Sequence, residues 1–354
     1  MILSFNNSRQ IGRWARLIYL MAVFVAPFPP GCKILAQEAH FSQFYTTPLL
    51  VNPANTGMTD ANLRFANNYR NQWAKIGVPY KTLYTSLDSK IAIAGKSFGI
   101  GALIVHDQSS AYNLAADQFL VSLSYSRIIK NHQFTVGIQP GFVSKAYNTN
   151  GLTFGSQFDG TSQQYNPRLT SYENYLSNNM GFFDLNAGVY WRTLIRNFMP
   201  SAGFSVSHIN RPKASFSSSP EATRLPMKYT FNGQVDIPLS KRFNIVPGML
   251  YSYASGANEL LLGGTENYAI TDFFIPAKKI YAITFARVNP FQNLDALILG
   301  GGIKFAKFDI GLSYDINISP LAQASNFNGA FELSLVYTGS GKSKRNIHEP
   351  CIIY

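Results

Sequence analysis

The chain has 354 residues and a formal charge of +12, yet only 14% of its residues are charged, while aromatic residues also reach 14%. Soluble proteins are about one quarter charged, so this composition argues against the nucleic-acid-binding surface that a basic chain would otherwise suggest. A chain poor in charge and rich in aromatic residues is better explained by walls that face lipid.

Residues 1–36 have the pattern of a cleaved export signal. Three arginines open it: Arg9, Arg13 and Arg16. Residues 17–25 form a short apolar run, and residues 34–36 offer a small-residue cleavage site before Gln37. A helix that spans a bilayer needs roughly 20 apolar residues, so a retained signal anchor is the less favoured alternative.

The two cysteines carry little chemistry. Lipidation at Cys32 is disfavoured because Pro29 stands where a lipid-attachment box normally has leucine. Cleavage after residue 36 would leave Cys351 as the only thiol, and a lone thiol makes neither an internal disulfide nor a metal site.

Residues 37–60 precede the first predicted strand and do not alternate. They contain five large apolar side chains: Phe41, Phe44, Tyr45, Leu49 and Leu50. Pro48 and Pro53 exclude a long helix. We therefore expect this segment to plug a barrel lumen or to bind a periplasmic partner, with a disordered leader as the remaining alternative.

Period-two alternation of apolar and polar residues recurs from residue 62 to residue 337. The predicted strands are 62–71, 80–90, 97–106, 117–128, 133–146, 182–194, 200–210, 227–239, 242–254, 258–264, 278–288, 294–306, 307–318 and 327–338. An even number of strands of roughly ten residues is typical of outer-membrane barrels. The fold prediction is all-β: a transmembrane antiparallel β-barrel of about 14 strands over residues 61–338, with residues 339–354 as a basic C-terminal periplasmic tail.

The connections predict the orientation of the barrel. The third, fifth and seventh are long (107–116, 147–181 and 211–226), and the fourth, eighth and twelfth are tight (129–132, 240–241 and 306–307). Outer-membrane barrels have long outer loops and short periplasmic turns, so the first strand is expected to run outward. The long tenth connection, 265–277, departs from this rule: either a strand is misassigned there or that turn has a function.

We find no pattern of catalytic or cofactor-binding residues. The five histidines are scattered: His40, His106, His132, His208 and His348. No serine lies in a nucleophile elbow. Glycines within the strands lack the following helix of a dinucleotide site, and we expect them to relieve crowding. The chain is therefore predicted to be neither an enzyme nor a cofactor-binding protein.

The predicted periplasmic turns and tail are basic: Lys130, Arg196, Lys241, Arg242, Lys307, Lys342, Lys344 and Arg345. Gathered on one rim, these charges would attract an acidic partner. Simple solvation of turn residues is the alternative explanation.

Three ordered motifs carry a family resemblance: HFSQFYTTPLLVNPANTG at 40–57, YRNQW at 69–73 and PYKTLYTSLD at 79–88. With them the chain resembles the PorP/SprF family, barrel-like membrane proteins of the type IX secretion and gliding motility machinery. The residues that match the family pattern are Phe41, Ser42, Gln43, Asn52, Pro53, Gly57, Arg70, Asn71, Gln72, Trp73, Tyr80 and Asp88. The C-terminus matches less well, because Pro350 precedes Cys351.

The resemblance implies an outer-membrane protein that anchors periplasmic secretion components and assists export or surface attachment of a secreted adhesin. The expected partners are outer-membrane lipid, periplasmic type IX components and such an adhesin, but no nucleic acid. An outer-membrane channel for hydrophobic small molecules is the alternative, and a soluble secreted adhesin is a third possibility.

The first two predicted strands form a hairpin whose register places Arg64 opposite Asp88. Both side chains would then share the polar face, so we predict an ion pair in the lumen, where charges must be paired or wet. Trp73 and Tyr80 would lie at the outer membrane–water boundary, as part of an aromatic girdle.

Overall fold

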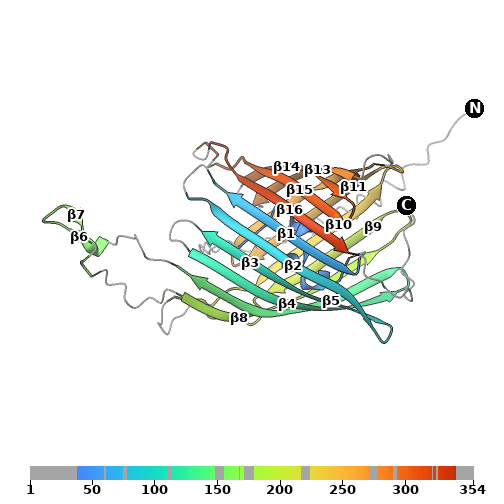
Figure 1. Cartoon of the computed structure of the whole chain (residues 1–354), viewed down its shortest axis with the longest axis horizontal. Coiled ribbons are helices and arrows are strands. Elements are labelled where there is room, and N and C mark those ends of the chain that lie inside the picture. The colour runs from blue at the N-terminus through green and yellow to red at the C-terminus, as the bar shows by residue number, and fades with distance from the viewer. Residues whose placement is uncertain are drawn as a thin grey trace, which may run out of the picture. The chain divides into compact units, whose positions relative to one another are not determined.

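The computed structural model describes residues 38–59, 61–74, 78–109, 114–147, 155–166, 168–170, 179–216, 224–270, 277–289, 293–320, 322–323 and 326–339. In this part of the chain, fourteen strands close into one antiparallel barrel in which each strand pairs with its neighbours in the chain and β1 pairs with β16 (Figure 1). The predicted export signal, Cys32, the C-terminal tail and Cys351 lie outside the described residues.

The barrel strands are β1 (Leu63–Gln72), β2 (Tyr80–Ile93), β3 (Lys96–Ser109), β4 (Leu114–Ile129), β5 (His132–Ala146), β8 (Asn179–Thr193), β9 (Met199–Ser207), β10 (Lys228–Pro238), β11 (Phe243–Ala254), β12 (Ala257–Ala269), β13 (Ala277–Asn289), β14 (Asn293–Phe305), β15 (Phe308–Asn317) and β16 (Ala330–Gly339). Each coincides with one predicted strand, so the fold prediction is confirmed. The connection between β5 and β8 contains a 3-10 turn, η3 (Gly155–Gln157), and a small hairpin, β6 (Phe158–Asp159) and β7 (Gln164–Tyr165).

Two boundary predictions were wrong. The tenth predicted strand, 258–264, continues to Ala269 in β12, so residues 265–269 of the long tenth connection are strand. Gly263 and Gly264 hid this continuation, because two adjacent glycines offer no side chains whose alternation could be read. The third connection is also shorter than predicted, since β3 and β4 extend to residues 109 and 114.

The strands alternate between an exposed apolar face and a buried polar face. Leu87, Phe119 and Phe183 are about half exposed on the outside, whereas Ser86 and Ser122 are buried on the inside. This pattern is typical of a lipid-facing wall around a polar interior. No helix among the described residues is long and apolar enough to cross a membrane.

The two ends of the barrel differ in their connections. One end, here the tight-turn end, has the connections 94–95, 130–131, 194–198, 239–242, 270–276 and 306–307. The other, the long-loop end, has 73–79, 110–113, 147–178, 208–227, 255–256, 290–292 and 318–329. The connections 110–113, 255–256 and 290–292 are also short at the long-loop end, and 270–276 is the longest at the tight-turn end, so the expected asymmetry is present but not uniform.

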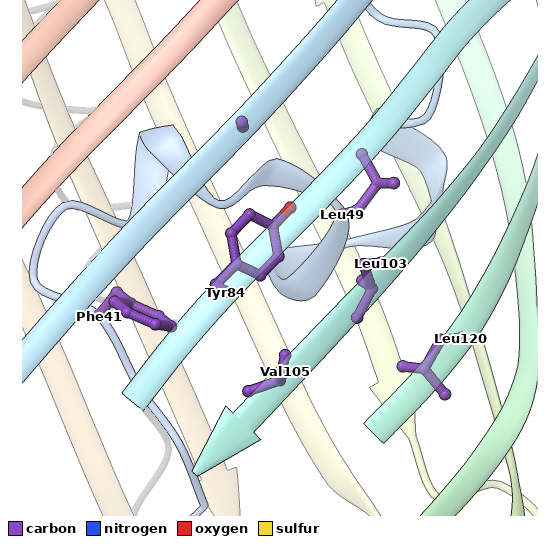
Figure 2. Packing of buried hydrophobic residues seen from close by; sticks show 7 residues of the cluster. Phe41, Leu49, Tyr84, Leu103, Val105 and Leu120 are labelled. Atoms are coloured by element: carbon purple, nitrogen blue, oxygen red, sulfur yellow. The ribbon is translucent and has the colours of Figure 1, made fainter. Parts of the chain in front are cut away.

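Residues 38–59, here called the luminal segment, occupy the interior of the barrel. They form η1 (Phe44–Thr46), α2 (Pro48–Val51) and η2 (Pro53–Asn55), which are short because prolines start two of them. Figure 2 shows Phe41 and Leu49 of this segment beside Tyr84, Leu103, Val105 and Leu120 of the wall. A second cluster packs Phe44 against Tyr281 and Phe285. The hydrophobic core therefore lies between the luminal segment and the wall.

The luminal segment crosses the barrel from one end to the other. Glu38 contacts His208, in the connection after β9, and therefore lies at the long-loop end. Gly57 lies against Ser89 and Gly99, near the tight-turn end of β2 and β3. The chain thus enters the lumen at the long-loop end and leaves it at the tight-turn end, where β1 begins.

Candidate functional site

Glu332, near the long-loop end of β16, holds the start of the luminal segment. Its carboxylate accepts hydrogen bonds from the backbone amides of Ser42 and Gln43, at 2.7 and 2.9 Å. It also accepts from Arg70 of β1, and its own side chain is fully buried. One carboxylate therefore joins the luminal segment to β1 and β16, the two strands that close the barrel.

Asp315 of β15 extends this contact into a balanced charge cluster. It accepts hydrogen bonds from Ser42 Oγ and Arg287 Nη2, both at 2.8 Å, and lies 3.0 Å from Arg70 Nη2. Together with Glu332, the central cluster contains two arginines and two carboxylates. A buried ion pair is tolerated only when its charges are matched and hydrogen-bonded, and this cluster meets both conditions.

Asp88 of β2 binds the other end of the luminal segment. It accepts a 2.7 Å hydrogen bond from the Gly57 amide. Arg64 Nε and Nη2 each donate to its carboxylate at 2.9 Å. The register of β1 and β2 places Arg64 opposite Asp88, which is the pairing expected from the sequence. Arg64 also donates to the carbonyl of Asn55, so this pair likewise joins wall to luminal segment.

Replacing Asp88 by alanine should lower the free energy of unfolding by about 3–5 kcal/mol, because a buried arginine then loses its partner. Adding Arg64→Ala should cost little more, with non-additivity of about 0.5–3 kcal/mol. Heat-modifiable gel migration after urea titration measures both losses. Leu87→Ala, on the exposed face of the same strand, is the control. Additive losses would mean that the two side chains act independently.

Glycines in the wall receive the middle of the luminal segment. A Cβ at Gly188 would lie 2.1 Å from Asn52 Oδ1, and a Cβ at Gly137 would lie 2.4 Å from the carbonyl carbon of Pro53. Real Cβ atoms do not approach other atoms this closely, so both positions require glycine. Asn52 is fixed there because its Nδ2 donates to the Val189 carbonyl at 3.0 Å and its Oδ1 accepts from the Ala54 amide at 2.9 Å.

The remaining motif residues lie on the first hairpin or pack against it. Phe41 is buried and meets the Tyr84 ring edge-on. Gln72 Oε1 accepts from Arg70 Nη2 at 3.2 Å, and Asn71 Oδ1 is buried without a partner among the described residues.

Trp73 and Tyr80 stack edge-on with ring centroids 5.4 Å apart, at the long-loop end. The twelve motif residues thus lie either in the luminal segment or on the strands β1 and β2 and the turn between them, and those of the luminal segment also contact β5, β8, β15 and β16.

A second ionic cluster, not predicted from the sequence, holds the luminal segment at the long-loop end. His208 lies between Glu38 and Asp184, with Nδ1 2.8 Å from Asp184 Oδ1 and Nε2 hydrogen-bonded to Glu38. Lys228 Nζ donates to Glu38 Oε2 at 3.2 Å. Burial lowers the pKa of His208, but attraction to Glu38 and hydrogen bonds to both carboxylates outweigh it and raise this pKa to about 10. Two strands, one connection and the luminal segment supply these groups, so no local pattern could have revealed them.

This cluster should make barrel stability depend on pH. The pKa of His208 is raised from its usual 6.5. The stabilisation of the folded barrel by protonated His208 is therefore complete below pH 6.5 and is lost as pH rises through about 10. The pKa of Glu38 is lowered, since Lys228 and His208 outweigh the effect of burial, so its contribution is present above pH 4.5. Near pH 6 the free energy of unfolding of wild type should be about 1.5–3 kcal/mol higher than that of the variant His208→Gln.

The difference in stability between wild type and His208→Gln should shrink toward pH 10, as measured by thermal melts of the two proteins at each pH. A constant difference from pH 6 to pH 10 would show that His208 is not protonated in the folded barrel.

The tight-turn end is basic in the part of the chain that the structure describes. Lys130, Arg196, Lys241, Arg242 and Lys307 are all exposed there, as the orientation of the strands requires. The described residues of these turns include no aspartate or glutamate. The predicted tail residues Lys342, Lys344 and Arg345 lie outside the described chain. No group of three or more potential ligands among the described residues is placed to hold a metal ion.

Comparisons with known proteins place the chain in a family. A family model described as "Type IX secretion system membrane protein PorP/SprF" matches residues 34–337. A search of the curated proteins finds no significant match.

Among solved structures, the chain is similar to the CymD monoaromatic hydrocarbon channel, with 11% identity, a TM-score of 0.50 and coverage of 84% of this chain and 93% of that chain. It is also similar to the Pseudomonas putida toluene transporter TodX, with 9% identity, a TM-score of 0.46 and coverage of 82% of this chain and 91% of that chain. A third similar structure is BamA from Haemophilus ducreyi lacking POTRA domains 1–3, with 10% identity, a TM-score of 0.42 and coverage of 78% of this chain and 70% of that chain. At 11% identity, the similarity to CymD shows a common barrel fold and nothing more.

Proposed function

Because the chain belongs to the PorP/SprF family of type IX secretion system membrane proteins, we propose that it anchors periplasmic components of that machinery to the outer membrane. An outer-membrane location follows from the family and from the closed barrel. In this proposal the tight-turn end faces the periplasm and binds an acidic partner there. The long-loop end faces outward and assists the export or surface attachment of a secreted adhesin.

The observation that carries the proposal is the basic charge of the tight-turn end. Exposed lysines and arginines occur in the turns after β4, β8, β10 and β14, and the described residues of the tight turns contain no acid. Clustered charges of one sign steer association with an oppositely charged surface and contribute specificity.

The filled lumen favours an anchoring role over the alternative, a channel for hydrophobic small molecules. The luminal segment binds the wall through Glu332 at its start and Asp88 at its end. A conduit would require this segment to leave or to shift, which would break buried charge contacts. The channel therefore stays the less supported function.

Charge reversal of the basic turns tests the proposal. The triple variant Lys130→Glu, Lys241→Glu, Arg242→Glu should lose co-purifying type IX components and reduce surface-protein secretion, while the barrel still folds. A matched control reverses three exposed charges at the long-loop end: Arg211→Glu, Lys213→Glu and Arg224→Glu.

Deletion of the gene separates the two functions. The anchoring proposal predicts a loss of surface-protein secretion with unchanged uptake of toluene. Normal secretion together with reduced toluene uptake would overturn the proposal and establish the channel.

A further inference from the structure

A cavity of about 420 Å³ lies between the luminal segment and the tight-turn end. The luminal segment forms its apolar floor with Phe44, Tyr45 and Val51, and Phe285 of β13 adds a wall. This volume is within the range of about 300–1,000 Å³ that is usual for ligand sites.

The wall residues of the cavity show which end it faces. Arg64 lies near the start of β1, Arg192 near the end of β8, Asp236 near the end of β10 and Lys279 near the start of β13. All of these strand ends belong to the tight-turn end. A ligand would therefore enter from the side on which the basic turns lie.

Two polar atoms of the lining have no partner within the described protein. Asn232 is 9% exposed and its Oδ1 accepts no hydrogen bond, and Tyr45 Oη is buried without a partner. Both atoms are covered by protein, so a ligand in the cavity would meet the charged and polar side chains of the wall rather than these two atoms.

The charges around the cavity are also open to a ligand. Arg192 donates to Gln133 Oε1 at 2.6 Å, and Lys279 Nζ lies 4.9 Å from the centre of the Tyr281 ring. Neither cation has a carboxylate within 4.0 Å among the described residues. Asp236 accepts only from the neutral amide of Asn244, at 2.8 Å. A polar, mixed-charge lining above an apolar floor fits a polypeptide better than an apolar molecule.

From these contacts we propose that the cavity binds an extended peptide segment of the periplasmic partner. A large apolar side chain of the peptide packs on Phe44, Tyr45 and Phe285, and its polar groups bind the charged side chains of the wall. Acidic residues on either side of that side chain meet the basic turns. This inference rests on the proposed anchoring function and names the part of the partner that the barrel recognises.

Two glycine variants in adjacent strands give a matched test. A Cβ at Gly248 would point toward the luminal segment, 3.6 Å from Phe44 Cζ, so Gly248→Leu fills the cavity without a backbone clash. A Cβ at Gly233 would lie 3.8 Å from Met249 Cγ on the outer face, where nothing comes closer than 3.6 Å. Gly233→Leu therefore adds the same side chain outside the cavity.

The probe is a pool of fluorescein-labelled acidic peptides, each with one central phenylalanine or leucine, titrated against the full-length protein in detergent by fluorescence anisotropy. Wild type and Gly233→Leu should bind members of the pool equally. Gly248→Leu should bind these peptides about tenfold more weakly than wild type does, which corresponds to about 1.4 kcal/mol of binding free energy. Wild type should show the same loss of affinity for peptides in which serine replaces the central phenylalanine or leucine. Heat-modifiable migration verifies that both variants fold.

Equal binding by both glycine variants, or no binding to wild type, would overturn the peptide site. Displacement of bound peptide by naphthalene but not by unlabelled peptide would also overturn it, in favour of a hydrocarbon site. If the cavity fails these tests while reversal of the turn charges still removes the partner, the anchoring function stands without a peptide site. If charge reversal changes nothing, the proposed function itself fails.

Discussion

Replacing Glu332 by alanine is expected to lower the free energy of unfolding of the barrel by about 3–5 kcal/mol, the usual cost of removing one partner from a buried ion pair. The loss should be at the upper end, because the amides of Ser42 and Gln43 lose their acceptor together with Arg70. Urea titration of the detergent-solubilised barrel, followed by heat-modifiable migration, gives the measurement.

Two further variants identify the cause of that loss. Glu332→Gln keeps the size and one acceptor oxygen, so it should recover part of the stability. Glu259→Ala removes a carboxylate that is 21% exposed and 3.8 Å from Arg287, and it should cost less than about 1 kcal/mol because partly solvated pairs contribute little. Equal losses from Glu332→Ala and Glu259→Ala would show that the central cluster is not held more tightly than its periphery.

The barrel wall could be predicted because its information is local. Each strand exposes apolar residues on one face and polar residues on the other, and this alternation is visible within ten residues of sequence. The register of β1 and β2 was readable for the same reason, since a hairpin pairs residues close in the chain. The prediction failed where glycines interrupt the alternation, as at Gly263 and Gly264 of β12.

The interior could not be predicted, because its contacts join distant parts of the chain. Glu332 contacts Ser42 at a separation of 290 residues in the sequence, and His208 contacts Glu38 at a separation of 170 residues. The composition of residues 37–60 predicted either a plug in the lumen or a segment that binds a periplasmic partner; the structure shows the first, with contacts that the sequence did not reveal. The strand glycines were correctly separated from a phosphate loop, yet only the structure shows that they make room for Asn52 and Pro53.

Gly137→Leu is expected to displace the luminal segment and to give the barrel a conductance in planar bilayers that wild type lacks. The Cβ of residue 137 would lie 2.4–2.5 Å from backbone atoms of Pro53 and Ala54. Backbone atoms cannot rotate away as a flexible side chain does, so the segment itself must move. Overpacking of this kind costs typically about 1–3 kcal/mol, less than the cost of breaking a buried charge pair, so the barrel should still fold.

Gly233→Leu, directed outward, is the matched control and should stay closed. Protease cleavage within residues 38–59 gives a second readout, since a displaced segment exposes backbone that is buried in wild type. Conductance together with cleavage would show that the luminal segment is what closes the barrel. Cleavage without conductance would mean that other parts of the chain also block the lumen. If neither changes while stability falls, the segment is a structural part of the core, and its contacts with Glu332, Asp88 and His208 hold it in place even against a backbone clash.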